Sequence, residues 1–262
     1  MTDTVLYEVD DQGVVVLTLS RPDRRNMWTA AMEAEFYDSL DRAAADPGVR
    51  IIVVTGAGTS FVPGLDPEVL AAVSSGVAYT SNRRPQTYPT TVPKPIVGAI
   101  NGSCAGIGLA QALMFDYRFA VRGAKFSTAF AKRGLPAEDA TAWVLTRLCG
   151  PSHAFELLAS GRLFLAEEAE RLGVVQQLSE PGSVVDDAVA FARGLAANVS
   201  PVAMAMIKSQ VWRDGETTME AARIRAQYLL QLAKEQPDFA EGTSSLTEKR
   251  PPNFDPYRGL NL

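Results

Sequence analysis

Apolar residues along the chain fall into two patterns: short β-branched runs, and longer segments whose apolar positions lie three or four residues apart. The runs at residues 14–19 and 51–54 predict buried strands, and the segment that Thr29 opens between them predicts a helix. Further strands are expected at residues 95–100, 116–121 and 174–178. Further helices are expected at residues 67–75, 106–115, 139–149, 153–160 and 166–172, and from residue 184 the pattern is helical almost to residue 244.

The alternation of strands and helices predicts an α/β fold with a parallel sheet and helices outside it. The helical last quarter predicts a separate layer, so we expect a core at residues 1–199 and a helical region at residues 200–262. Residues 76–91 are rich in Ser, Arg, Thr and Pro, which favours a surface loop or a mobile helix. The proline-broken tail at residues 249–254 is expected to lie over the surface.

Composition removes several classes of function. Of the 262 residues, 47% are hydrophobic and 21% charged, which is typical of a globular protein and not of a disordered or fibrous one. Two cysteines and one histidine exclude a disulfide scaffold, and we expect no metal site. A net charge of −5 without long runs of either sign argues against nucleic acid or a membrane surface as a partner. The first residues lack the features of a signal peptide, so we expect a cytoplasmic protein.

Two glycine-rich turns are the first candidates for chemistry. The turn at residues 55–66 joins a buried strand to a helix start, where unsatisfied backbone N–H groups could hold a phosphate or an oxyanion. It also fits a simple tight turn in which Asp66 caps the helix and Pro67 takes its first position. The turn at residues 101–110 again joins a strand to a helix. Two such turns that each aim an N–H group at one point would form an oxyanion hole for a carbonyl substrate.

Both turns belong to a wider set of segments with a shared pattern. The set comprises residues 19–26 (LSRPDRRN), 56–66 (GAGTSFVPGLD), 94–102 (KPIVGAING), 124–126 (AKF), 166–175 (AEEAERLGVV) and 248–252 (EKRPP). With these segments the chain resembles the crotonase superfamily, the enoyl-CoA hydratases and isomerases, over nearly its whole length. The resemblance implies a crotonase-like ββα spiral core, a C-terminal helical domain, and a homotrimer or a dimer of trimers. It also implies a role in fatty acid metabolism and a coenzyme A thioester as substrate, with no separate cofactor.

Position by position, the resemblance implies that the backbone N–H groups of Leu65 and Ile107 polarise the thioester carbonyl. Neither donor depends on its side chain, but Ile107 is bulky where the family commonly has glycine, so it is expected to narrow the pocket. Ile107 and Phe130 also hint at an apolar acyl pocket. The substrate-binding residues that the resemblance implies are Arg25 and Met27 in the coenzyme A channel, and Val62, Gly64, Asp66, Gly106 and Phe130 around the thioester and its pantetheine and adenine ends.

Both glutamates of a family hydratase are missing. Family hydratases add water with two glutamates, and the matching positions here look like Ala110 and Phe130. Loss of a general acid or base lowers a rate by roughly 10²–10⁴-fold per group. We therefore expect isomerisation, hydrolysis or other enolate chemistry rather than efficient hydration.

One carboxylate remains at an informative place. Glu138 stands where 4-chlorobenzoyl-CoA dehalogenases and 3-hydroxyisobutyryl-CoA hydrolases of the family carry a reactive acid, which implies that Glu138 is the catalytic acid, base or nucleophile. Asp139 is the alternative, and either residue also fits an acid that complements a helix dipole. His153 is expected to be structural, and Cys104 lacks an accompanying base. The other interpretation of the chain is an acyl-CoA-binding protein or partner subunit without activity.

Overall fold

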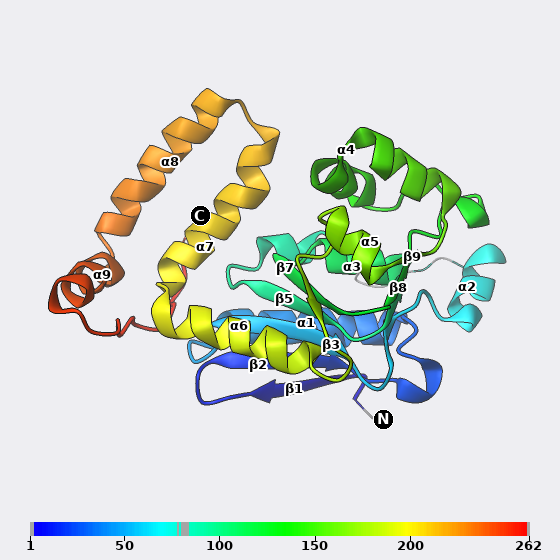
Figure 1. Cartoon of the computed structure of the whole chain (residues 1–262), viewed down its shortest axis with the longest axis horizontal. Coiled ribbons are helices and arrows are strands. Elements are labelled where there is room, and N and C mark those ends of the chain that lie inside the picture. The colour runs from blue at the N-terminus through cyan, green and yellow to red at the C-terminus, as the bar shows by residue number, and fades with distance from the viewer. Residues whose placement is uncertain (1–2, 78, 80–83, 261–262) are drawn as a thin grey trace.

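A six-stranded sheet forms the centre of the computed structural model, which describes residues 3–77, 79 and 84–260 (Figure 1). The strand order is β1-β2-β3-β5-β7-β10, and only β1 runs antiparallel to its neighbour. The expectation of an α/β fold with a mainly parallel sheet is confirmed. The strands are β1 (Val5–Val9), β2 (Val14–Leu19), β3 (Ile51–Gly56), β5 (Ile96–Ile100), β7 (Tyr117–Val121) and β10 (Gln177–Ser179).

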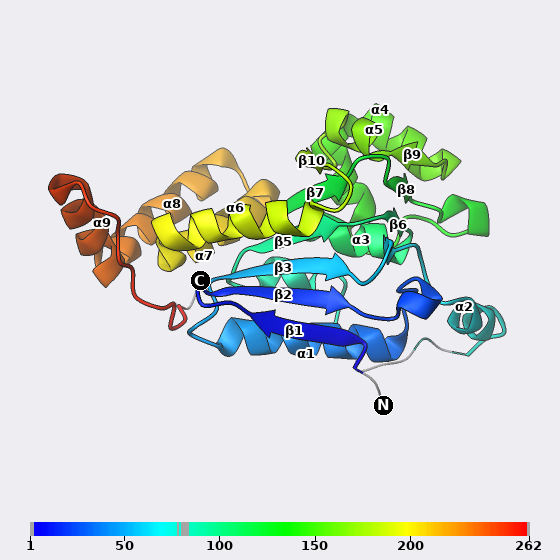
Figure 2. The same ribbon diagram turned by 60° about the horizontal axis from the view of Figure 1, so that its bottom comes forward.

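Helices cover both faces of this sheet. Residues of α1 (Ala30–Ala45) and α3 (Ile107–Leu113) share one apolar cluster, and residues of α6 (Val184–Asn198) belong to a second one (Figure 2). Strand β3 is buried throughout, because its two faces contribute to both clusters. That burial explains why its sequence is continuously apolar instead of alternating.

A second, smaller sheet was not predicted from the sequence. Its order is β4-β6-β8-β9, with β4, β6 and β8 parallel. Each strand has only two or three residues, too few for a recognisable period-two pattern. The chain thus repeats one unit, in which a long strand is followed by a short strand and a helix, as expected of a ββα spiral. The short strands are β4 (Ser60–Val62), β6 (Ser103–Ala105), β8 (Lys125–Ser127) and β9 (Phe164–Leu165).

One expected break within a helix is confirmed, and one expected strand begins later than predicted. The break expected between the helices at residues 139–149 and 153–160 is confirmed, because Gly150 (φ 77°, ψ 165°) is non-helical and divides α4 (Thr141–Ser160) into two helical segments just before Pro151. The strand expected at residues 174–178 begins only at Gln177, because Val174 and Val175 both donate their N–H groups to the carbonyl oxygen of Ala169. These valines close the end of α5 (Ala166–Arg171) and are buried there. Strand β1 was also missed.

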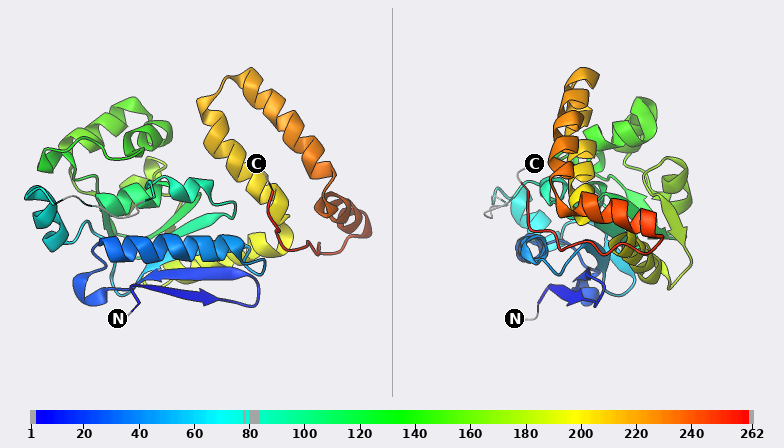
Figure 3. Two further views of the ribbon diagram at one scale, coloured as in Figure 1. Left: turned by 180° about the vertical axis from the view of Figure 1, so that it is seen from behind. Right: turned by 90° about the vertical axis from the view of Figure 1, so that its left-hand side faces the viewer.

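The last three helices project from the core (Figure 3). They are α7 (Pro201–Arg213), α8 (Met219–Lys234) and α9 (Pro237–Glu248). The expected boundary at residues 199–200 coincides with a bend of 116° between α6 and α7, although a division into separate domains stays a prediction. The tail returns over the core as expected, with Phe254 and Tyr257 buried. Within the described ranges, no single helix is long and apolar enough to cross a membrane.

The segment between α2 (Pro67–Ser74) and β5 is described only in part. The expectation of a surface loop or mobile helix at residues 76–91 therefore falls partly outside the described residues. Its described end is a short 3-10 helix, Tyr88–Thr91. Gln86, just before that helix, is fully buried.

Candidate functional site

Three parallel strands of the small sheet end at the same edge. Val62 of β4 pairs with Cys104 of β6, which in turn pairs with Phe126 of β8. The Gly106 N–H donates to the Ser127 carbonyl oxygen (3.0 Å), which ties the segment after β6 to the end of β8. Ligands of α/β sheets bind outside the carboxyl ends of parallel strands. A ligand site is therefore expected among the residues that follow these three strands.

Leu65, after β4, is held by a short bridge to Trp28. The Trp28 N–H donates to the Gly64 carbonyl oxygen, and the Asp66 N–H donates to the Trp28 carbonyl oxygen, both at 2.9 Å. This parallel bridge skips Leu65, whose own N–H points away from Trp28. In the described part of the chain, no hydrogen bond uses the Leu65 N–H.

Ile107, after β6, is the first residue of α3. The N–H groups in the first turn of a helix have no acceptor within the helix. Gly106 stands at the capping position and has no side chain that could supply one. Like the Leu65 N–H, the Ile107 N–H has no acceptor among the residues that the structure describes.

The same glycine arrangement precedes both donors. Gly64 (φ 145°) and Gly106 (φ 53°) adopt positive φ values, and a Cβ built on either one would meet no other atom within 4 Å. Gly108 differs, because a Cβ there would lie 2.2 Å from the Val62 carbonyl oxygen. The first turn of α3 therefore packs tightly against the end of β4, while the backbone before each donor borders open space.

The Asp66 carboxylate already has hydrogen-bond and ion-pair partners within the protein. Its carboxylate accepts from the Glu68 N–H at 3.1 Å and pairs with Arg21 and Arg24, each at 3.1 Å. Burial alone would raise the pKa of Asp66, but the backbone N–H and the two guanidinium groups hold the pKa below its usual value. The expected role of Asp66 as helix cap is confirmed. Its N–H is already given to Trp28, and a contact of Asp66 with coenzyme A stays a prediction.

Arg25 and Met27 flank a buried asparagine. Asn26 is fully buried, and its amide donates to the carbonyl oxygens of Ala57 and Ser60, both at 2.8 Å. Arg25 and Asn26 both take left-handed backbone conformations (φ 53° and 59°). This turn places the exposed Arg25 beside β4, where its Nε donates to the Ser60 hydroxyl at 3.5 Å. Asn26 belongs to the segment at residues 19–26 (LSRPDRRN), but the sequence alone predicted no role for it.

The two positions that a hydratase would fill with glutamate are apolar and buried. Ala110 is 1% and Phe130 5% exposed. From Phe130 the chain turns back, with the Leu135 N–H donating to the Phe130 carbonyl oxygen, and then reaches Glu138. Glu138 is half-buried and precedes α4, whereas Asp139 is exposed with a φ of 49°.

The thiol and the imidazole are not placed for chemistry at the two turns. Cys104 is fully buried in β6, and burial raises the pKa of its thiol far above the usual value, so the thiol stays protonated. His153 is exposed on α4. The carboxylates therefore remain the candidates for proton transfer.

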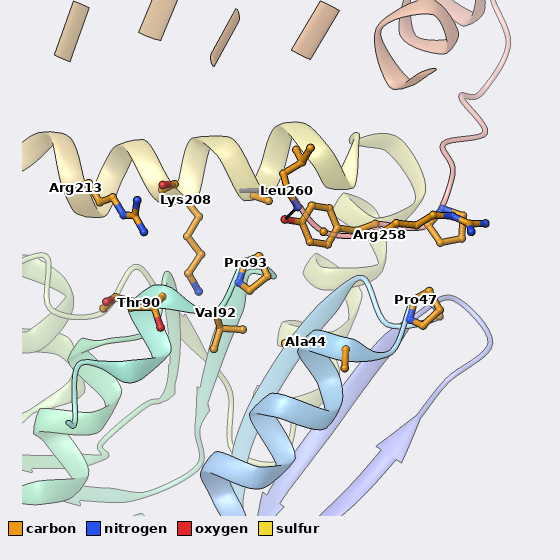
Figure 4. A pocket seen from close by; sticks show the side chains of 17 residues that line it. Ala44, Pro47, Thr90, Val92, Pro93, Lys208, Arg213, Arg258 and Leu260 are labelled. Atoms are coloured by element: carbon orange, nitrogen blue, oxygen red, sulfur yellow. Dashed lines mark hydrogen bonds between the residues drawn. The ribbon is translucent and has the colours of Figure 1, made fainter. Parts of the chain in front are cut away.

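A cavity of about 750 Å³ lies at the opposite, amino edge of the main sheet (Figure 4). It is bounded by the end of α1, residues 90–93, α7 and the tail. Lys208 in its wall already pairs with Asp116 (2.7 Å) and donates to the Lys94 carbonyl oxygen (3.1 Å). None of the predicted site residues, all of which are described, lines this cavity.

Comparison with known proteins gives a consistent result. The family model for enoyl-CoA hydratase/isomerase matches residues 10–256. The 1,2-epoxyphenylacetyl-CoA isomerase of Escherichia coli is 30% identical over 97% of this chain and 99% of its own. A putative enoyl-CoA hydratase of Thermus thermophilus is 31% identical over 95% of this chain and 100% of its own.

Solved structures agree with this result. An enoyl-CoA hydratase from Mycobacterium marinum is 44% identical over 82% of this chain and 100% of its own, with a TM-score of 0.72. A putative enoyl-CoA hydratase from Streptomyces coelicolor is 30% identical over 97% of this chain and 94% of its own, with a TM-score of 0.88. The similarity in both cases extends well beyond the two glycine turns.

Proposed function

The chain belongs to the enoyl-CoA hydratase/isomerase family, and we propose that it binds an acyl-CoA thioester and polarises the thioester carbonyl between the N–H groups of Leu65 and Ile107. The observation that carries the proposal is the pair of turns in which each donor lacks an acceptor in the described chain and follows a glycine that borders open space. Such donors stabilise the charge that develops on the oxygen, and one of them typically contributes about 10²–10³-fold in rate.

The reaction that we propose is isomerisation, hydrolysis or other enolate chemistry. Ala110 and Phe130 carry no group that transfers a proton, so the two-glutamate addition of water has no acid or base at these positions. The Escherichia coli relative is named as an isomerase of a CoA thioester, which supports this direction. Glu138 is the carboxylate proposed to act on the substrate.

Two steps are open to Glu138 in this site. As a base, its carboxylate would take a proton from a carbon next to the carbonyl, and the resulting enolate oxygen would accept from Leu65 and Ile107. In a β,γ-unsaturated acyl group this enolate is conjugated with the double bond, so return of the proton to the γ-carbon would shift the double bond and complete an isomerisation. As a nucleophile, the carboxylate would attack the carbonyl carbon, and the C–S bond would break to release coenzyme A as a thiolate, which takes a proton from water. A second water would then hydrolyse the acyl-enzyme anhydride to the free acid and the Glu138 carboxylate. The two N–H groups stabilise the oxyanion in both cases.

The test replaces Glu138 by Gln and measures turnover of a panel of acyl-CoAs by mass spectrometry. We expect the E138Q variant to lose about 10²–10⁴-fold in kcat, because the amide neither accepts a proton nor attacks. D139N is the matched control and should keep its activity. Unchanged turnover of every active substrate in E138Q would remove Glu138 from the mechanism, and a loss in D139N alone would move the role to Asp139.

The second candidate function is binding of acyl-CoA without turnover, as a carrier or a partner subunit. The loss of both glutamate positions favours it. Titration calorimetry would then show acyl-CoA binding while mass spectrometry shows no product. Saturable turnover of any acyl-CoA would exclude this candidate.

Assembly as a homotrimer or a dimer of trimers is part of the proposal. The projecting helices carry large apolar side chains that are more than half exposed, which supports an assembly that covers this surface. Light scattering on the purified protein tests this, and a monomer would contradict it. The cytoplasmic location and the role in fatty acid metabolism stay predictions. The exposed apolar residues include Ile207, Val211, Met219, Ile224, Phe239 and Leu246.

A further inference from the structure

A buried polar cluster connects α1, the segment before β5, and α3. Its members, each at most 3% exposed, are Trp28, Glu33, Tyr37, Gln86 and Gln111. The Glu33 carboxyl oxygen Oε2 accepts from the Trp28 indole N–H and from the Gln86 amide, both at 2.9 Å. The Gln111 amide donates to the Gln86 carbonyl oxygen at 3.3 Å, and the Tyr37 hydroxyl donates to Gln111 Oε1 at 3.0 Å.

Glu33 is an unusual residue for its position. It lies on α1 next to Met32 and near Phe36, both of which are fully buried in the main apolar cluster. Burying a carboxyl group in such surroundings is unfavourable unless hydrogen bonds compensate for the lost water. Glu33 meets this condition, and an apolar residue at this position would leave the Trp28 indole and the Gln86 amide without this acceptor.

One arm of the cluster leads to Leu65. Glu33 fixes the Trp28 ring, which also packs edge-on against Phe36 with 5.8 Å between ring centroids. The Trp28 backbone bonds to Gly64 and Asp66, the two residues on either side of Leu65. The direction of the Leu65 N–H therefore depends on where the Trp28 backbone lies.

The other arm leads to Ile107. Gln111 is four residues after Ile107 on α3, so the two side chains lie on the same side of the helix one turn apart. The hydrogen bond between Gln111 and Tyr37 links α3 to α1, and the one to the Gln86 carbonyl oxygen links α3 to the segment before β5. Gln86 joins the arms, because its amide donates to Glu33 while its backbone oxygen accepts from Gln111.

We propose that Glu33 is a positioning residue that holds the Leu65 and Ile107 N–H groups at the spacing one carbonyl oxygen needs. Glu33 does not touch the thioester and acts through Trp28 and Gln86. This inference rests on the proposed function, since it assigns a role within that same site. A displacement of about 1 Å in a catalytic group can reduce a rate about 10²-fold, so a fixed spacing has a large effect.

Three variants separate the contribution of the Glu33 acceptor oxygens from that of the Trp28 indole donor. Glu33→Met removes both acceptor oxygens and keeps a long side chain, and Trp28→Phe removes only the indole donor. Glu33→Gln retains one carbonyl oxygen that can accept from Trp28. The matched control is Trp212→Phe, since the Trp212 indole donates to Asp116 at 2.8 Å in a similar pair at the opposite edge of the sheet.

The measurement is the infrared stretching frequency of acetyl-CoA labelled with ¹³C at its carbonyl and bound to each variant. Polarisation by two donors lowers this frequency relative to the free thioester. We expect wild type and W212F to show the full downshift, E33Q to keep part of it, and E33M and W28F to lose most of it. For any acyl-CoA that turns over, kcat should fall about 10- to 100-fold in E33M with a smaller change in KM. The E33M/W28F double variant should lose no more kcat than E33M alone, because E33M has already removed the hydrogen bond that W28F breaks.

Circular dichroism and thermal melts establish which variants fold. Should E33M fail to fold, W28F decides the question, because it removes a single donor. A full downshift in folded E33M and W28F would overturn the role of Glu33 and leave the proposed function standing. Absence of a downshift in the wild type would overturn the proposed function and this inference together.

Discussion

Polar groups are bonded differently at the two ends of the parallel strands, which we call the amino edge and the carboxyl edge of the central sheet. At the amino edge, Asp116 accepts from the Ile96 N–H (2.7 Å) and the Trp212 indole (2.8 Å) and pairs with Lys208 (2.7 Å). Beyond the carboxyl edge, the Leu65 and Ile107 N–H groups have no acceptor in the described chain. At the amino edge the protein satisfies these polar groups itself, whereas at the carboxyl edge two donors remain for the proposed thioester.

The unused donors and the cavity therefore lie at opposite edges of the sheet. The cavity of about 750 Å³ lies at the amino edge, where Lys208 is buried and its charge is compensated. Burial lowers the pKa of Lys208, and the nearby Asp116 opposes that change. A ligand at this edge would have to compete with bonds that the fold already makes.

Removal of the Asp116 carboxylate at the amino edge should reduce the stability of the protein and leave the candidate site at Leu65 and Ile107 intact. Asp116→Ala leaves the Lys208 ammonium buried without its counter-ion, and we expect a loss of about 3 kcal/mol in the free energy of unfolding. Urea titration measures this loss. The D116A/K208M double variant should recover part of it, because the unpaired charge is gone. A fall in kcat of folded D116A would mean that the amino edge takes part in the chemistry.

Strain in the backbone at the carboxyl edge should reduce turnover. Gly106→Ala places a Cβ on a residue with φ of 53° and ψ of −123°, which lies outside the regions allowed to residues with a Cβ, and relaxation of that strain would rotate the Ile107 N–H. We expect about a 10-fold loss in kcat. Gly259→Ala is the control, since Gly259 also has a positive φ (93°) with open space beside it, but lines the cavity at the amino edge. Equal losses in both variants would contradict a special role for the Ile107 N–H.

The smallest effect concerns Lys94 at the amino edge, whose Nζ donates to the carbonyl oxygens of Ala43 and Asp46. Burial lowers the pKa of Lys94 from 10.5 to about 8. The folded state then binds the proton more weakly than the unfolded state, so stability should rise as the pH increases through this value. Between about pH 7.5 and about pH 8.5 the rise should be about 0.7 kcal/mol, and K94M should abolish it. An identical pH slope in K94M would assign the effect to another group.

The long elements were predictable from sequence because their patterns are long. Strand β2 and the helix capped by Thr29 appear within a residue of where apolar spacing and capping place them. The short strands β4, β6 and β8 were not predictable, since three residues hold no periodicity. Val174 and Val175 were misassigned to a strand, because buried positions at the end of a helix and in a strand both favour apolar residues such as valine.

The candidate site was predictable only where backbone geometry follows from glycine. The turns at Gly64 and Gly106 were identified from the sequence, and the structure brings them together. The Glu33 cluster was not identified, because Gln86 and Gln111 come from distant segments and no local spacing links them. The signal that was present was Glu33 itself, an acid beside the apolar stripe of its helix.

The most direct test of the proposed oxyanion hole is a crystal structure with a bound acyl-CoA thioester. We expect the thioester oxygen within about 2.7–3.1 Å of both the Leu65 and the Ile107 nitrogen atoms, with Glu138 facing the reacting carbons. A thioester bound elsewhere, or an oxygen that contacts neither nitrogen, would contradict it.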